Sequence, residues 1–95
     1  MKIDCNKKDG TLYVSLDGRM DTVSAPLFER FLADNAGVDA LTIDCEKLAY
    51  ISSAGLRVLL SAQKKLKSAM KLVNVQELVM EVFEMTGFAD ILTIV

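Results

Sequence analysis

Two adjacent serines and a nearby glycine are the residues of this chain with the clearest potential for chemistry. Ser52 and Ser53 follow an apolar run, and Gly55 comes two residues later, where a helix is predicted to begin. The first N–H groups of a helix lack intrahelical acceptors, and the helix dipole makes that end electropositive. A phosphate is stabilised at such a position without a lysine. Glycine costs about 1 kcal/mol there relative to alanine, which favours a close approach of another molecule to the backbone.

A purely structural explanation of the same residues is open as well. Serine is an ordinary first residue before a helix, and glycine near a helix start often permits tight packing of the helix on a strand. Ser53 has Leu56 three residues later rather than Glu or Gln, so a capping box is excluded.

The composition argues against catalysis. The chain has no histidine, which removes Ser-His-Asp and Cys-His nucleophile pairs and the commonest metal ligand. Its two cysteines, Cys5 and Cys45, lie in apolar alternation and are expected to be buried free thiols. We therefore expect neither an enzyme nor a bound metal or cofactor.

The charge and hydropathy of the chain exclude two further classes of function. A formal net charge of −2, from 11 basic and 13 acidic residues, argues against binding nucleic acid by phosphate neutralisation. The longest uncharged stretch, residues 48–56, is far shorter than the roughly 20 residues that a transmembrane helix needs. Residues 1–4 contain no apolar core of a secretory signal. No direct membrane insertion and a cytoplasmic location are expected.

The elements that must position the serines follow from hydrophobic periodicity. Strands are expected over residues 2–6, 11–17, 40–45, 70–75 and 91–95, with Gly18 ending the second of them. Helices are expected from Thr22–Pro26 to Asn35–Gly37, over 54–67 and over 77–85. Asp9-Gly10 predicts a hairpin between the first two strands, and Thr22 or Ser24 is expected to cap the first helix.

Strands and helices alternate after the opening hairpin, which predicts right-handed crossovers. The expected fold is a single α/β domain over residues 1–95, with a mixed, mostly parallel sheet and helices packed against it. Apolar residues at helical spacing predict the side of each helix that faces the core. The expected core residues are Leu27, Phe28, Phe31 and Leu32, then Leu56, Leu59, Leu60 and Leu66, then Leu78, Val79, Val82 and Phe83, with Met80 and Met85 as filler. Lys64, Lys65 and Lys67 are expected in solvent.

Three segments carry a resemblance to a known family. YISSAGLRVLL, residues 50–60, looks like the signature of the STAS domain, the family of anti-sigma factor antagonists. GRMDT, residues 18–22, resembles the family's Gly-x-Leu-Asp segment after the second strand. VFEMTGF, residues 82–88, resembles its closing Leu-Phe-x-x-(Ser/Thr)-Gly-(Leu/Phe) segment. Together they span the chain in the family's order.

This resemblance implies a regulatory switch. Members bind an anti-sigma factor that is also a serine kinase with a GHKL-type ATP site, which frees the sigma factor. Phosphorylation of one serine of an Asp-Ser-(Ser/Thr)-Gly motif breaks the complex, and a metal-dependent phosphatase restores it. The motif corresponds here to Ser52-Ser53-Ala54-Gly55, so the acceptor corresponds to Ser53, with Ser52 as the alternative. Ser52 stands where the family motif has aspartate.

The expected partner-binding residues are Asp21, Ser52, Ser53, Gly55 and Arg57. Asp21 would face the partner or orient a hydroxyl, unless it only caps the helix with Thr22. Arg57, one turn after Ser53, would pair with an acidic partner, unless it is a solvated cation. The alternative function is a STAS subunit that serves as a structural component of a lipid-transport or transporter complex without being phosphorylated.

Overall fold

One mixed sheet of four strands and the helices around it make up the computed structural model, which describes residues 1–66 and 69–95. The elements in chain order are β1 (Lys2–Lys8), β2 (Thr11–Met20), α1 (Ser24–Asp34), β3 (Ala40–Ile51), α2 (Ser53–Leu66), β4 (Met70–Val73), α3 (Glu77–Thr86) and a 3₁₀ turn, η2 (Phe88–Asp90). No helix of the described residues has the length and hydropathy to cross a membrane.

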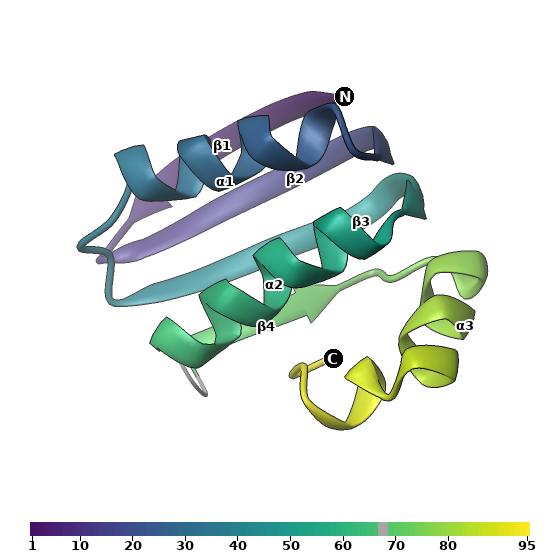
Figure 1. The fold of residues 1–95 in the computed structure, drawn as a ribbon. Helices are drawn as coiled ribbons and strands as arrows, with labels where there is room; N and C mark the ends of the chain where they lie inside the picture. The colour runs from purple at the N-terminus through teal and green to yellow at the C-terminus, as the bar shows by residue number, and fades with distance from the viewer. Residues whose placement is uncertain (67–68) are drawn as a thin grey trace.

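The sheet has the order β1-β2-β3-β4, with β1 antiparallel to β2 and the other neighbours parallel. Helices α1 and α2 lie side by side over one face, and α3 lies beyond β4 (Figure 1). The hairpin predicted at Asp9-Gly10 is confirmed, because both residues have the positive φ, 52° and 82°, that the favoured two-residue turns require. The expected α/β fold is therefore confirmed.

Strand β3 is longer than the sequence predicted, and the predicted end at Cys45 is wrong. Its pairing with β2 shifts register twice, between Ser15 and Asp17 and again between Gly18 and Arg19, because β3 carries an extra residue at each place. Buried residues of β3 therefore change spacing from two to three, which removes the alternation on which the prediction depended. Gly18 likewise does not end β2, which continues to Met20.

The predicted final strand over 91–95 is wrong. After η2, the chain makes only an isolated parallel bridge, Leu72 with Ile94. The Leu72 N–H donates to the Thr93 carbonyl at 2.9 Å, and the Val95 N–H donates to the Leu72 carbonyl at 2.9 Å. The segment is apolar because Leu92 is buried, and burial of one side chain does not require an extended strand. The neighbouring strand β4 also ends earlier than predicted, at Val73.

The core lies between the sheet and the helices, and most of its predicted members are confirmed. Phe28, Leu56, Leu59, Val79 and Phe83 are buried in it, while Phe31, Leu32, Leu66, Met80 and Val82 pack against it partly exposed and Leu60 is half-buried.

Four side chains predicted to be buried are exposed instead. They are Leu27, Leu78, Met85 and Cys5. Cys5 lies on the edge strand β1, where no helix reaches it, whereas Cys45 is buried as predicted. Burial raises the pKa of the Cys45 thiol to about 12, with a further contribution from the Asp44 carboxylate. Lys64 and Lys65 are exposed as predicted, and Lys67 lies outside the described residues.

Candidate functional site

The carboxyl ends of β2 and β3 bring the predicted site residues to one edge of the sheet. Strand β2 leads into α1 through Asp21, and β3 leads into α2 through Ser52. The Ser52 N–H donates to the Met20 carbonyl at 2.8 Å, which joins the two strand ends directly. Parallel strands end at the same edge of a sheet, which is the usual place for ligands in open α/β folds. The structure thus brings Asp21 and the two serines together.

Ser52 closes the start of α2. Its Oγ accepts the Gly55 N–H at 3.3 Å, and its carbonyl oxygen accepts the Leu56 N–H at 2.9 Å, the first bond of the helix. These are the two contacts of a helix-capping serine. The helix therefore begins at Ser53, one residue before the predicted start at 54, and Ser52 caps it.

Ser53 is the first residue of α2, and its side chain is exposed. Its hydroxyl makes no hydrogen bond within the part of the chain that the structure describes, and neither do the N–H groups of Ser53 and Ala54. The first turn of α2 contains no acidic residue. An exposed hydroxyl thus lies beside free amides at the electropositive end of a 14-residue helix.

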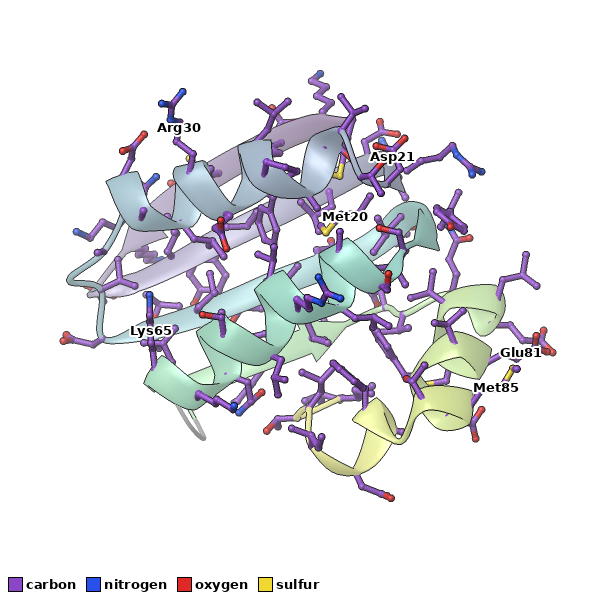
Figure 2. All side chains as sticks on the ribbon, viewed as in Figure 1. Met20, Asp21, Arg30, Lys65, Glu81 and Met85 are labelled. Carbon is purple, nitrogen blue, oxygen red and sulfur yellow. The ribbon has the colours of Figure 1, made fainter. Side chains whose placement is uncertain are left out.

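Gly55 is buried, and its position supports the packing explanation. A Cβ on Gly55 would lie 2.8 Å from Ile51 Cγ1 and 2.9 Å from Met20 Cγ, distances that real side chains essentially never show. Figure 2 shows Met20 at the sheet end beneath the start of the helices. Glycine therefore lets α2 lie directly on the ends of β2 and β3, and this close packing sets the position of Ser53 relative to the edge of the sheet.

Asp21 occupies the start of α1. Its Oδ1 accepts the N–H groups of Val23 and Ser24, each at 3.0 Å. Hydrogen bonds from Ser24 first, and then from Val23, hold the pKa of the Asp21 carboxyl below its usual range. The expectation that Thr22 or Ser24 supplies the cap is wrong, because the Asp21 carboxylate accepts these amides.

Ser24 is buried beneath Asp21 and ties the loop to the sheet. Its Oγ accepts the Asp21 N–H at 2.9 Å and donates to the Arg19 carbonyl at 2.7 Å. The capping alternative for Asp21 is thus the one with direct structural support, and Figure 2 shows the Asp21 side chain at this edge.

A cation–π pair that sequence reasoning missed lies at the same edge. The Arg19 guanidinium carbon lies 4.2 Å from the centre of the Tyr50 ring, well within range of a favourable contact. The two residues are register partners only because of the second bulge in β3. A strand interrupted at Cys45, as the alternation predicted, gives no signal for this pair.

Exposed apolar side chains accompany the pair. Tyr50 is 39% exposed, Val23, in the loop before α1, is 75% exposed, and Leu27, in the first turn of α1, is 59% exposed. An aromatic residue, an arginine and isolated aliphatic residues around a polar centre are typical of protein-binding surfaces. Arg57, one turn after Ser53, is exposed, and no ion pair to it occurs within residues 1–66 and 69–95.

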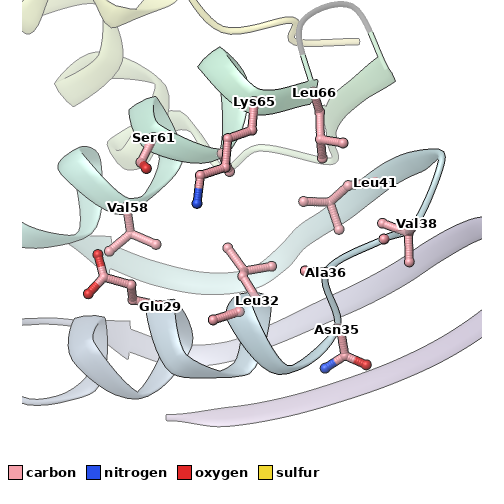
Figure 3. Close-up of a pocket in the computed structure, with 13 residues that line it drawn as sticks. Glu29, Leu32, Asn35, Ala36, Val38, Leu41, Val58, Ser61, Lys65 and Leu66 are labelled. Carbon is pink, nitrogen blue, oxygen red and sulfur yellow. The ribbon is translucent and has the colours of Figure 1, made fainter.

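A cavity lies away from the serines. It has a volume of about 270 Å³ between the C-terminal halves of α1 and α2, and Leu32, Leu41 and Val58 line it, with Lys65 above (Figure 3). Both helices run away from the serine edge, so this cavity is at their far ends. No group of three or more possible metal ligands occurs in the described chain.

Comparisons with known proteins agree on one family. The STAS domain family matches residues 2–95. BtrV of Bordetella bronchiseptica, which is named as an anti-sigma factor antagonist, is 38% identical over 96 residues, covering 96% of this chain and 83% of its own. The anti-sigma-B factor antagonist of Bacillus subtilis is 30% identical over 99 residues, covering 99% of this chain and 90% of its own.

Solved structures share the fold at lower identity. An anti-sigma factor antagonist from Thermotoga maritima superposes with a TM-score of 0.87 at 21% identity, over 97% of this chain and 84% of its own. The Bacillus cell fate determinant SpoIIAA, in its phosphorylated form, superposes with a TM-score of 0.75 at 16% identity, over 99% of this chain and 91% of its own.

Proposed function

The chain belongs to the STAS domain family, and from this membership we propose that it is an anti-sigma factor antagonist that a serine kinase switches off at Ser53. Unphosphorylated, it binds an anti-sigma factor with a GHKL-type ATP site in the cytoplasm and so releases a sigma factor. Phosphorylated at Ser53, it dissociates, and a serine phosphatase restores binding. Two relatives of at least 30% identity are named as anti-sigma factor antagonists, which supports the antagonist part of the proposal.

The observation that carries the proposal is the free hydroxyl of Ser53 at the start of α2. A phosphoserine carries about −1.5 to −2 charges and three acceptor oxygens. At this position the free N–H groups and the helix dipole stabilise that charge, so the fold is retained. Ser52 is the less suitable acceptor, because its Oγ already accepts the Gly55 N–H.

Loss of binding follows from where the charge arrives. The surface around Ser53 combines Tyr50 with exposed aliphatic residues, which a partner desolvates when it binds. A dianion at the centre of that contact adds volume and a large desolvation cost. The switch is therefore steric and electrostatic, and it needs no backbone movement. SpoIIAA, which shares the fold, is known in a phosphorylated form, which supports this reading.

The test begins with identification of the kinase. Ser53→Ala is the best bait for a pulldown from native cell extract, because the complex should persist when ATP is present. Wild type, Ser53→Ala, Ser52→Ala and Thr22→Ala are then incubated with the captured kinase and ATP, and phosphopeptides are mapped. Only Ser53→Ala should lose the label.

Thr22 is the matched control, because it is an exposed hydroxyl residue in the turn before α1, on the same edge. Label on Ser52 alone would place the acceptor one residue earlier. Label on neither serine would favour the alternative, a structural STAS subunit that is not phosphorylated. Ser53→Asp should weaken the complex less than phosphorylation does, since one carboxylate carries about half the charge.

A further inference from the structure

Helix α3 has one side in the core and an opposite side with large apolar residues in solvent. Val79 and Phe83 are 1% and 0% exposed, whereas Leu78 and Met85 are 67% and 86% exposed. Leu78 and Met85 are seven residues apart, about two helical turns, so they share one side of α3. Figure 2 shows Glu81 and Met85 pointing away from the rest of the fold. These two apolar side chains are not part of the core.

The same side of α3 is acidic. Glu77, Glu81 and Glu84 are all exposed, and Glu81 lies between Leu78 and Met85 at helical spacing. All 11 basic residues of the chain occur at or before Lys71, so every charged side chain in residues 72–95 is acidic. The ion pair found among the described residues, Lys2 with Asp4, is on β1. We call the exposed residues Glu77, Leu78, Glu81, Glu84 and Met85 the α3 face.

Charge decides which class of molecule fits the α3 face. Anionic lipid headgroups and nucleic-acid phosphates are repelled by the three glutamates. A metal site is not supported, because no cluster of three possible ligands occurs in the described chain. A basic amphipathic helix fits on both counts: its apolar side covers Leu78 and Met85, and its Lys or Arg residues face the glutamates. Unbranched Met85 adapts to partners of different shape.

We infer that the α3 face is a second docking surface, and that its occupant is a basic amphipathic helix of a protein partner. This surface contains no residue of the Ser53 switch and carries no serine, so binding here is independent of phosphorylation. The protein would therefore hold one partner through α3 while the partner at Ser53 is exchanged.

The probe for the test is a synthetic peptide of about 18 residues with leucine at helical spacing and lysine elsewhere. Binding is measured by calorimetry and mapped by amide chemical shifts. One peptide should bind per chain, with shifts centred on residues 77–86. The double variant Leu78→Ala/Met85→Ala and the triple variant Glu77→Gln/Glu81→Gln/Glu84→Gln should each weaken binding by about tenfold or more, or 1.4 kcal/mol.

The matched control removes three carboxylates elsewhere. Asp4, Asp17 and Glu46 are exposed around a polar hollow on the open face of the sheet. The triple variant Asp4→Asn/Asp17→Asn/Glu46→Gln should bind the peptide as wild type does, and so should Ser53→Asp. All the substitutions are at exposed positions, and circular dichroism confirms that each variant is folded.

Four results would overturn the inference. They are absence of binding, equal binding of a scrambled peptide of the same composition, equal loss in the sheet-face control, and shifts centred on the sheet or on Ser53. Each leaves the phosphopeptide map of Ser53 unaffected, so failure here is distinguishable from failure of the proposed switch.

Discussion

The two helices that begin at the serine edge start in the same way but treat charge differently. In α1 the Asp21 carbonyl accepts the Ala25 N–H at 2.9 Å, and in α2 the Ser52 carbonyl accepts the Leu56 N–H at 2.9 Å. Asp21 and Ser52 are therefore equivalent, and so are Thr22 and Ser53. Asp21 supplies a carboxylate to the start of α1, whereas Ser52 supplies a neutral hydroxyl to the start of α2.

The difference shows what makes one junction fixed and the other available for a switch. In α1 the amides of Val23 and Ser24 already donate to a resident anion, Asp21. In α2 the cap satisfies the Gly55 N–H alone, and Ser53 carries a hydroxyl next to amides that remain free. An added phosphate would repel Asp21 at the first junction, whereas the second has no acid in its first turn.

Exchanging Ser24 and Gly55, each three residues after the capping residue Asp21 or Ser52, should have the largest effect on stability. Gly55→Ser should destabilise the fold by about 1–3 kcal/mol, because its Cβ overlaps Met20 and Ile51. Ser24→Gly should cost about 1–2 kcal/mol through its lost hydrogen bonds. Urea unfolding measures both losses, provided that the dependence of the unfolding free energy on urea concentration is the same as in wild type. Wild-type stability of Gly55→Ser would show that close packing does not set the position of α2.

Substitutions of Ser52 and Ser53 should have the next largest effects on stability, and the two effects should differ. Ser52→Ala should cost about 1 kcal/mol, the usual value of a lost cap. Ser53→Ala should stay within about 0.5 kcal/mol of wild type, as an exposed position without a hydrogen bond does. Thermal and urea unfolding report both values. Equal losses would mean that both hydroxyls serve the helix, and the contrast with α1 would disappear.

A carboxylate added at Ser53 and one added at Thr22 should differ in their effect on the stability of the fold. Ser53→Asp should stabilise the fold by about 0.3–1 kcal/mol at low ionic strength, since the helix dipole favours an anion there. Thr22→Asp should be less stable than Ser53→Asp, because Asp21 is adjacent. Unfolding at low and high salt measures the difference, which should shrink with salt. An equal gain at both positions would contradict the idea that Asp21 already fills the first site.

The smallest expected effect is a decrease in the stability of the fold at low pH. The lowered pKa of Asp21 in the folded state means that its contribution is complete above the ordinary carboxyl pKa of 3.8. That contribution is lost as pH falls through the folded-state value. Asp21→Asn should remove this part of the acid dependence, and Ser52→Ala should not. Superimposable pH profiles of wild type and Asp21→Asn would show that the carboxylate acts elsewhere.

The part of the site that could be predicted consists of residues that lie close together in the sequence. Ser52, Ser53 and Gly55 were located by the start of a helix after an apolar run, and Asp21 by a second short segment. Which serine caps could not be predicted, because either hydroxyl satisfies the rule and only the exact first residue of α2 decides. The packing role of Gly55 depends on Met20, a residue of another strand.

What the sequence could not predict depended on contacts distant along the chain. The pairing of Arg19 with Tyr50 arises from a bulge, which hydrophobic alternation hides. Leu78 and Met85 satisfy helical periodicity, yet α3 packs against β3 and η2 through its other side, which buries Val79 and Phe83 instead. Fold class was predictable because alternation of strands and helices needs no such detail.

The two bulges of β3 also determine where this chain can change length. A residue added or removed at 35–38 leaves the pairing of β2 with β3 intact, since the loop first bonds to the sheet at Asp39, whose N–H donates to the Gly10 carbonyl at 2.9 Å. Deletion of Ala49 would remove one bulge and restore regular alternation, so Leu48 and Ile51 would still face the core. Ile51 would stay opposite Met20, and the serines would keep the edge that they share with Asp21. Natural changes of length are therefore expected in the loop before β3 and at its two bulges, and not at the regularly paired residues between them.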